Sequence, residues 1–578
     1  MPESSKTSSD REILVAAHEK GLLSTFGAFF RLSGPGWLQS AITLGGGSLG
    51  SALYLGVLCG TSMMWLPLLA IVVGVIMLTS ISYVVLSSGE RPLKAINEHV
   101  NPVLGVGWVT ATILANMIWV LPQFSLCFDI GHKILLPDTI QDTDVFKYGI
   151  SVGLFLLAAF LVFLNLKGGW ASRIFDILLK LIVGAIVLSF VAVVVSLYRE
   201  GYLEFTSILA GLVPRPEHWF APVSSVSELV SKLPESSQEY WSTEFVTNQR
   251  NVMISTTATV VGINMTFLLP YSMLNRGWDR PFRGLATFDL ITGLAIPFVI
   301  VFSCIVIASG FNFHAKADEN FLSDDPALVQ QSPVFGSASG ILLKSLVADD
   351  TSMDISELTE TQVANLVSQA SQEDRTLAAM LVKPDSAMLA KSLEPLLGPT
   401  YANLVFGLGA FGMGFSTIII LMMINGFAVS ELFGMPRNIT IQMLGAVLAG
   451  LIGVMWPMFW AGESKTWLII LASTFGAILL PIAYIAFFAL MNNRTLLKDD
   501  MLTGAWRWIW NALMAFGVLA ALAQAGSALY TKLFDPTTGS LIALQPGSMI
   551  FGGIVTFALL ALIGFSATKG RQTDSHEE

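Results

Sequence analysis

Long uncharged apolar runs divide this chain into membrane-spanning segments. A helix needs about 20 residues to cross roughly 30 Å of hydrocarbon at about 1.5 Å per residue. The first run extends from Leu32 to Gly89, which is long enough for two helices, and Gly60-Thr61-Ser62 is the natural division between them. Further spans are expected near 105–130, 146–166, 173–198, 253–275, 285–309, 401–430, 438–460, 466–492, 505–530 and 548–568. The pattern predicts an all-α polytopic membrane protein with about twelve transmembrane helices.

Composition excludes the soluble classes. Of the 578 residues, 53% are hydrophobic and 12% are charged, against roughly 25% charged residues in ordinary soluble proteins. The three cysteines all lie in apolar stretches, so they form neither a disulfide framework nor a thiolate metal cage. A formal net charge of −10 and the absence of a basic tract exclude nucleic acid as a partner.

Basic residues set the expected orientation, because short cytoplasmic loops retain positive charge during insertion. Residues 1–30 are polar with charges of both signs and lack the pattern of a cleavable signal, so they are interpreted as a cytoplasmic tail. With that tail inside, the short outer loops hold Lys133, Lys147, Lys465 and Lys532, and most other Lys and Arg residues near the spans fall inside. We expect an integral protein of the plasma (inner) membrane with both termini cytoplasmic.

The spans group into a repeated architecture. Two sets of five helices have opposite topology, as in leucine-transporter-like five-plus-five inverted repeats. The expected divisions are a cytoplasmic tail (1–33), a first five-helix repeat (34–198), an extracytoplasmic loop (199–252), helices six and seven (253–309), an acidic extracytoplasmic insertion (310–400), helices eight to eleven (401–530), and helix twelve with a cytoplasmic tail (531–578).

The 310–400 insertion carries thirteen acidic and five basic residues. Its 352–397 part has helical apolar spacing and capping residues, which predicts a small helical cap. One interpretation is a vestibule that gathers cations or contacts a partner. The other is a soluble decoration whose acidity only aids solubility.

Span one contains the first candidate site, at Gly45, Gly46, Gly47 and Ser48. Three contiguous glycines cost roughly 1 kcal/mol each in a helix interior relative to alanine. A break there would turn backbone carbonyls and amides toward a solute at mid-membrane depth. The alternative is close helix packing through small residues.

Span six contains the second candidate site, at Asn264, Met265 and Thr266, with Pro270 one turn later. Each polar group there is alternatively a hydrogen bond between packed helices. Spans one and six occupy equivalent places in the two halves, and transporters built on inverted repeats bind their solute between such discontinuous helices. We therefore predict that both helices are broken and face one site.

Other polar residues inside the spans are candidates for a permeation path, although each alone is equally explained by a packing hydrogen bond. They are Gln39, Thr43, Asn116, Gln123, Ser416 and Thr417. Four ionisable residues lie near span ends and have either a functional or an interfacial role. They are Asp129, Asp176, Lys180 and Asp289.

The opening helix resembles a known family. The stretch Gly34-Pro35-Gly36-Trp37-Leu38-Gln39-Ser40, followed by Leu44 and Gly56, is similar to the first helix of the Nramp (natural resistance-associated macrophage protein) family of proton-coupled divalent metal transporters. Further similar positions follow in order. They are Ser88-Gly89-Glu90-Arg91-Pro92-Leu93, Gly211-Leu212-Val213-Pro214, Ser416-Thr417, Leu480-Pro481-Ile482-Ala483 and Asn493-Arg494. The resemblance implies the fold of the Nramp family and a metal-ion substrate.

The chain departs from that family at the positions that would bind metal. Gly45 to Ser48 stand where the family has Asp-Pro-Gly-Asn, so no carboxylate is present there. The family's methionine, proline and histidine of helix six align with Thr266, Phe267 and Leu268, although Met265 is one residue away. A divalent ion needs anionic or several neutral oxygen ligands in place of its hydration shell. No histidine lies mid-membrane, and no metal ligand is assigned with confidence.

These features predict a secondary transporter that moves an ion, foremost a divalent metal cation, by alternating access. A small anion or neutral solute on the same fold is one alternative, since amides at a half-helix start favour negative charge. A non-transporting receptor or scaffold is another, with the 310–400 insertion as its interaction module. An enzyme is not expected, because no catalytic spacing such as H-E-x-x-H appears. No cofactor is expected, and the partners are the lipid bilayer and a small ion or solute.

Overall fold

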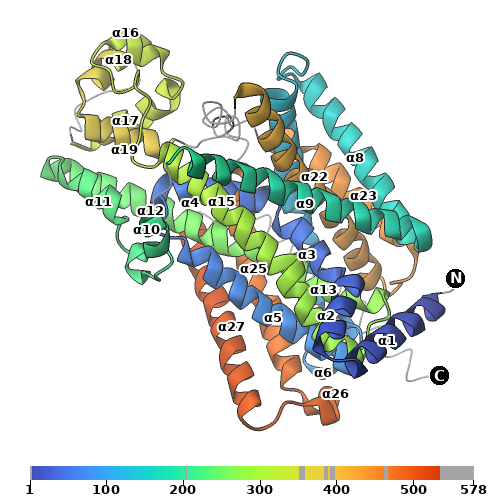
Figure 1. The fold of residues 1–578 in the computed structure, drawn as a ribbon. Coiled ribbons are helices and arrows are strands. Elements are labelled where there is room, and N and C mark those ends of the chain that lie inside the picture. Colours follow the sequence, from blue (N-terminus) through green and yellow to red (C-terminus); the bar gives the residue numbers. More distant parts are fainter. Residues whose placement is uncertain are drawn as a thin grey trace.

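The computed structural model describes residues 3–201, 205–349, 358–382, 388, 390, 398–460 and 467–533, and these ranges contain helices and connecting turns but no strand. Figure 1 shows long helices packed into one bundle, with short helices at its two ends. The predicted all-α class is confirmed.

Nine helical segments of the described residues are long and apolar enough to cross a membrane. They are α5 (Trp65–Ser88), α7 (Pro102–Ile130) continued by η1 (Gly131–Leu135), α8 (Asp144–Lys167), α9 (Gly169–Arg199), α12 (Glu235–Val260) with α13 (Ile263–Asn275), α14 (Arg283–Leu290) with η4 (Ile291–Ala295) and α15 (Ile296–Phe313), α22 (Pro399–Leu432), α25 (Trp467–Met491), and α27 (Gly504–Leu533).

A tenth span consists of two short helices, α3 (Pro35–Thr43) and α4 (Gly46–Cys59), that are bent by 50° at their junction. The predicted division after this span is confirmed, because α4 ends at Cys59 and α5 begins at Trp65. The predicted span 438–460 corresponds to the shorter apolar helix α23 (Ile439–Val454) followed by α24 (Trp456–Phe459). The predicted span 548–568 lies outside the described residues.

The two ends of the bundle carry different short helices (Figure 1). One end, here called the N-terminal face, carries α1 (Glu3–Glu19), α2 (Leu22–Leu32), α6 (Pro92–His99), η3 (Arg280–Phe282), α26 (Arg494–Leu497) and η5 (Lys498–Asp500). The other end, here called the insertion face, carries α10 (Phe205–Ala210), η2 (Pro216–Trp219), α11 (Ser224–Ser231), α16 (Pro326–Gln331), α17 (Phe335–Asp349), α18 (Glu360–Gln369) and α19 (Gln372–Leu381).

The insertion folds as a small helical unit on the end of α12. Helix α18 begins with a capping box in which Thr359 and Gln362 satisfy each other's backbone amides. The buried Arg375 donates to Asp324 and to the carbonyl of Ser323. Trp241 on α12 donates its indole N–H to Asp374 at 2.8 Å, which joins the insertion to the membrane helices. Of the predicted 352–397 cap, α18 and α19 are present, and residues 350–357, 383–387, 389 and 391–397 lie outside the described residues.

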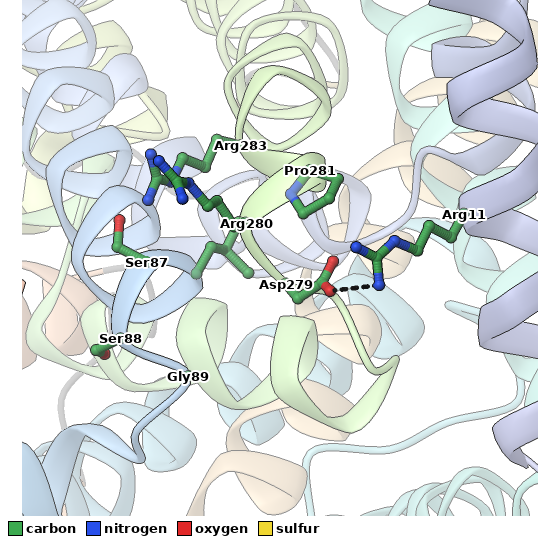
Figure 2. Close-up of a pocket in the computed structure, with 9 residues that line it drawn as sticks. Arg11, Ser87, Ser88, Gly89, Asp279, Arg280, Pro281 and Arg283 are labelled. Atoms are coloured by element: carbon green, nitrogen blue, oxygen red, sulfur yellow. Dashed lines mark ion pairs between the residues drawn. The ribbon is translucent and has the colours of Figure 1, made fainter. Parts of the chain in front are cut away.

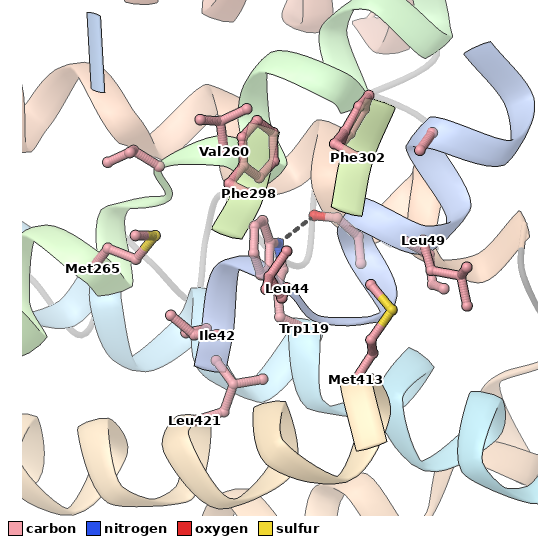
Figure 3. Packing of buried hydrophobic residues seen from close by; sticks show 14 of the residues in the cluster. Ile42, Leu44, Leu49, Trp119, Val260, Met265, Phe298, Phe302, Met413 and Leu421 are labelled. Atoms are coloured by element: carbon pink, nitrogen blue, oxygen red, sulfur yellow. Dashed lines mark hydrogen bonds between the residues drawn. The ribbon is translucent and has the colours of Figure 1, made fainter. Parts of the chain in front are cut away.

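The core lies around the bent span. Figure 3 shows Ile42, Leu44 and Leu49 of that span packed among Phe298 and Phe302 of α15, Met413 and Leu421 of α22, and Val260 and Met265 from either side of the α12–α13 junction. Trp119 of α7 is held by a 2.8 Å hydrogen bond from its indole N–H to the carbonyl of Ala472 on α25. The bent span is therefore enclosed by helices from both halves of the sequence.

Candidate functional site

The bend between α3 and α4 confirms the break predicted in span one. Leu44 and Gly45 lie outside the helical conformation, with Gly45 extended at φ −101° and ψ −176°. The hydroxyl of Ser48 donates to the carbonyl of Thr43, so the side chain of one half-helix satisfies the last carbonyl of the other. The break thus consists of a two-residue junction bridged by Ser48.

Each glycine at this break is required by a close neighbour. A Cβ on Gly45 would stand 2.2 Å from Thr417 Oγ1. One on Gly46 would stand 2.7 Å from Gln123 Oε1, and one on Gly47 would stand 2.8 Å from Thr259 Cγ2. The three glycines therefore let the start of α4 approach α22, α7 and α12 at once. This close packing and the helix break, which the sequence offers as alternatives, occur together.

The first amide of α4 already has a partner. The Gly46 N–H donates to Gln123 Oε1 at 3.0 Å. The first amides of a helix have no acceptor within the helix, so a side chain from elsewhere satisfies this one. An anion would have to displace Gln123 to reach it, which weakens the argument for an anionic substrate.

Span six is interrupted where α12 ends at Val260 and α13 begins at Ile263. Val261 and Gly262 between them are extended. Among the described helix pairs, only α3 and α4 are bent by more than 40°, and α12 with α13 forms one span of 41 residues. The second break is thus an interruption of the backbone hydrogen bonding without a comparable bend.

The two breaks meet at Thr43, the last residue of α3. Its Oγ1 lies 3.2 Å from the carbonyl oxygen of Val260, the last residue of α12. The same Oγ1 lies 3.2 Å from Met265 Sδ in the first turn of α13. A hydroxyl, a carbonyl and a thioether therefore converge where the two interrupted helices face each other.

The other two predicted residues of span six have different surroundings. Asn264 accepts the amide N–H of Met265 at its Oδ1, and its Nδ2 is buried without a partner. The Thr266 hydroxyl donates to the carbonyl of Ile263 and accepts the indole N–H of Trp108 at 3.1 Å. Thr266 thus has its hydrogen bonds within the protein, whereas Asn264 keeps two amide protons unused.

The residues predicted to line a permeation path also fall into two groups, those with hydrogen-bond partners and those without. Gln123 caps α4, and Ser416 and Thr417 on α22 donate to carbonyls, including that of Ala41 on α3. Gln39 and Asn116 are both fully buried, and neither side-chain amide has a hydrogen-bond partner. A buried polar group without a partner costs about 1–3 kcal/mol. Three such amides, those of Gln39, Asn116 and Asn264, belong to the helices α3, α7 and α13 near the breaks.

Three of the four ionisable residues noted in the sequence gather at the start of α3. Asp289 on α14 is buried and accepts the amides of Gly34 at 3.1 Å and Gly36 at 2.6 Å together with the Ser33 hydroxyl. Lys180 on α9 donates to the carbonyl of Ser33 at 3.0 Å. These contacts, here called the α3 seat, fix the N-terminus of the half-helix to its neighbours.

An ion pair lies beside the α3 seat, where Arg276 donates to Asp176 at 2.8 Å. The Arg276 guanidinium also lies against Gly34, where a Cβ would meet it at 2.5 Å. Asp129, the fourth ionisable residue, is instead paired with Lys133 at 2.9 Å. The sequence identifies these charges but not that three of them surround one helix end, since α3, α9 and α14 are far apart along the chain.

A hollow of about 220 Å³ opens at the N-terminal face between the ends of α5, α13 and α22. Its polar lining includes Arg91, Tyr271, Glu431, Arg437 and Gln442. Glu431 is buried and pairs with Arg91 at 3.5 Å. Because Tyr271 belongs to the same helix as Asn264 and Met265, this hollow lies along α13 from the breaks.

A larger hollow of about 560 Å³ lies at the same face beside α1 (Figure 2). It is lined by three arginines, but Arg11 pairs with Asp279 at 3.4 Å, and Arg280 and Arg283 pair with Asp500 at 2.6 Å and 2.7 Å. Each guanidinium contacts a carboxylate, and Arg280 and Arg283 share that of Asp500. This hollow is a junction between α1, η3 and η5 at which two carboxylates offset most of the charge of three arginines.

The fold and the two interrupted helices are typical of integral membrane transporters built on inverted repeats with discontinuous helices. The chain matches the family model described as natural resistance-associated macrophage protein-like (Nramp) over residues 36–346 and 375–525. It therefore belongs to the Nramp family, and it is a transporter of the divalent metal class, as the sequence predicts. The small anion, neutral solute and scaffold alternatives are not favoured.

Solved structures support the fold. The chain is similar to a manganese transporter of Eremococcus coleocola in complex with an aromatic bis-isothiourea compound, with a TM-score of 0.58 and 11% identity over 94% of each chain. A mutant of that transporter, in which one histidine is replaced by alanine, gives a TM-score of 0.57, again with 11% identity over 94% of each chain. At 11% identity this similarity supports the fold alone. No curated protein sequence matches the chain.

Proposed function

We propose that this protein carries a divalent metal cation across the plasma membrane by alternating access and binds it with neutral ligands between the two breaks. The main support is the convergence of Thr43 Oγ1, the Val260 carbonyl oxygen and Met265 Sδ. The hydroxyl oxygen lies 3.2 Å from each of the other two atoms. Carbonyl and hydroxyl oxygens suit hard divalent ions, and a thioether favours softer ones. No carboxylate is needed to form this donor set.

The unpaired amide oxygens of Gln39 and Asn116 supply further ligands to the proposed site. Gln39, Asn116 and Asn264 are buried at 0–1% exposure with amide atoms that have no partner in this state. A cation that keeps part of its water shell offers hydrogen-bond donors to the amide oxygens of Gln39 and Asn116. Neutral ligands hold a bare divalent ion weakly, so we infer that the ion arrives with several of its waters, as magnesium does in most protein sites.

Alternating access follows from the contacts that hold α3. The half-helix is attached at its start by the α3 seat and at its end by Thr43, while Gly45 leaves the junction free to bend. Release of the α3 seat would let α3 swing and open the site toward the N-terminal face. The hollow lined by Tyr271 and Glu431 is the exit path in this proposal.

The orientation of the proposed path rests on charge. The N-terminal face carries Arg11, Arg91, Arg276, Arg437 and Arg494, as expected for the cytoplasmic side. The insertion face carries the described acidic residues of 310–400, among them Asp318, Asp324 and Glu360, and we propose that it is extracytoplasmic and gathers cations before they enter. We propose that both termini are cytoplasmic, which for the C-terminus requires that the predicted span 548–568, outside the described residues, crosses the membrane.

Transport by the purified chain in liposomes tests the proposal. Uptake of manganese, magnesium, bicarbonate and chloride is measured in one panel, with an imposed proton gradient and without it. We expect uptake of at least one divalent cation and none of the anions. Anion uptake without cation uptake would overturn the proposed substrate class, and no uptake of any ion would overturn transport.

Met265→Leu tests the role of the sulfur, because leucine nearly keeps the volume while removing the donor atom. We expect the half-saturating concentration for manganese and cadmium uptake to rise about tenfold or more, in line with the 10–100-fold losses seen when even supporting groups of metal sites are removed. Magnesium uptake should change little, since a hard ion gains little from sulfur. Equal effects on all three ions would place Met265 outside the coordination of the ion.

A further inference from the structure

Three side chains at the N-terminal face, outside the membrane breaks, bring metal-ligating atoms together. Within the described residues, Glu90, Glu98 and His99 form the one group of three such side chains whose ligand atoms all lie within 4.8 Å of one another. Glu90 follows the end of α5, and Glu98 and His99 end α6. The short turn between these two helices brings Glu90 close to the end of α6.

The state of the His99 ring follows from its neighbour. His99 Nδ1 lies 3.2 Å from Thr495 Oγ1. The Thr495 hydroxyl donates its one proton to Asn493 Oδ1 at 2.7 Å, so it accepts from the ring and Nδ1 carries a proton. In the neutral imidazole the lone pair is then on Nε2. A protein hydrogen bond that fixes the far nitrogen in this way is the usual arrangement of a metal-binding histidine.

The lone pair on Nε2 faces a carboxylate. Nε2 lies 3.8 Å from Glu90 Oε2, too far for a hydrogen bond. Both atoms are shielded from solvent, and neither has a hydrogen-bond partner. When the ring is neutral, Nε2 and Glu90 Oε2 are two acceptors that face each other, and either a proton on Nε2, which makes an ion pair, or a metal ion between them removes their repulsion. Metal–ligand distances of about 2.0–2.2 Å place two ligands of one ion roughly 3–4 Å apart, which matches this spacing.

We propose that Glu90, Glu98 and His99 bind a divalent transition-metal ion at the cytoplasmic mouth of the transporter. One imidazole nitrogen and two carboxylates suit manganese, cobalt or zinc, and water fills the remaining positions because Glu98 is exposed. Lys94 lies 3.7 Å from Glu98 and is its present partner, so that carboxylate turns from Lys94 to the ion.

The position relates this site to the exit path. Glu90 stands between Gly89 and Arg91, which both line the hollow with Glu431. Asn493 donates from its Nδ2 to the carbonyl of His99 at 2.9 Å and caps α26 with its Oδ1. The bound ion therefore links the α5–α6 turn to α26, at the place where a transported ion leaves. The site itself requires no transport and stands apart from the proposed midplane ligands.

Pulsed electron paramagnetic resonance of manganese bound to the untagged full chain in detergent tests the site. The midplane ligands include no histidine, so imidazole coupling does not come from the proposed transport site, and its loss in His99→Ala assigns it to this one. We expect this coupling in the wild-type chain and in Gly46→Leu, and its loss in His99→Ala. His18→Ala is the matched control, because that ring lies on α1 and bonds to the Leu14 carbonyl, and it should keep the coupling.

Two further variants keep the test valid if His99→Ala fails to fold. Glu90→Gln removes the charge with little change of shape, and Thr495→Val removes the acceptor that fixes the ring. We expect manganese affinity at this site to fall by about 10–100-fold in Thr495→Val. The proposal is overturned if imidazole coupling is absent from the wild-type chain or survives His99→Ala. Failure of uptake in Gly46→Leu with coupling retained separates this site from the transport site.

Discussion

Gly46→Leu is expected to abolish metal uptake while the protein remains folded in the membrane. A Cβ at this position would already meet Leu126 Cδ2 at 2.6 Å and Gln123 Oε1 at 2.7 Å. The rest of the leucine side chain would push Gln123 from the start of α4 and force α4 away from α7, which distorts the α3–α4 break. Overpacking of this kind costs about 1–3 kcal/mol, which a helix bundle of this size tolerates. The measurement is initial uptake in liposomes, normalised to reconstituted protein.

Gly153→Leu is the matched control for that variant. Gly153 lies on α8 at an exposed position where a Cβ would meet nothing within 4 Å. Uptake by this control should equal that of the wild-type chain. If Gly46→Leu retains wild-type uptake, the site does not lie at the α3–α4 break and the location proposed here is wrong.

Asp289→Asn is expected to lower uptake by at least about tenfold and to loosen the start of α3. The carboxylate accepts the Gly34 and Gly36 amides and the Ser33 hydroxyl. Hydrogen bonds to a charged group contribute about 1.5–3 kcal/mol each, and about 1.4 kcal/mol corresponds to a factor of ten in an equilibrium constant. In the asparagine variant the acceptor of the Gly34 and Gly36 amides is no longer charged, and an NH₂ group stands where Oδ1 accepted the Ser33 hydroxyl, so these bonds weaken.

Hydrogen exchange of the amides in 33–36 measures that loosening directly, beside uptake in the same preparation. Exchange should accelerate in Asp289→Asn and remain slow in Asp144→Asn, whose carboxylate is 83% exposed. Loss of uptake with unchanged exchange at Gly34 and Gly36 would show that Asp289 acts elsewhere than in holding α3. Unchanged uptake with faster exchange would show that the α3 seat does not control access.

The break in span one was predictable because its signal is local. Each glycine destabilises a helix interior relative to alanine. Gly45, Gly46 and Gly47 are contiguous, so their combined cost falls at one point and favours a break there. The break in span six was predictable only as a region, since Asn264 to Thr266 begin α13 and the interruption itself is at Val261 and Gly262. Valine gives no sign of this in sequence, and the extended junction depends on contacts with α3 and α7.

The roles of the polar residues were not predictable from sequence. Thr266 and Asn264 both lie in the first turn of α13. The Thr266 hydroxyl accepts the indole N–H of Trp108, whereas Asn264 Nδ2 has no hydrogen-bond partner. Likewise Gln123 and Asn116 lie on one helix, but only Gln123 meets the start of α4. Such differences depend on which neighbour from a distant segment lies within hydrogen-bonding distance.

The proximity of Glu90, Glu98 and His99 was likewise not predictable from the sequence. Along the sequence they are ordinary polar residues in and beside the turn between two helices, and their spacing matches no metal motif. The turn brings Glu90 onto the end of α6, and Thr495, almost four hundred residues later, decides which ring nitrogen is available.

Hydrophobic run lengths and contiguous glycines alone determined that this chain spans a membrane many times and that its first span is interrupted, because both signals arise within a few tens of residues. The resemblance of its opening helix gave the family. Only the tertiary structure decided that Thr43, Val260 and Met265 meet, that Asp289 holds α3, and that Gln123 occupies the first amide of α4. Contacts between distant segments are fixed by the packing of the whole bundle, and no local pattern encodes that packing.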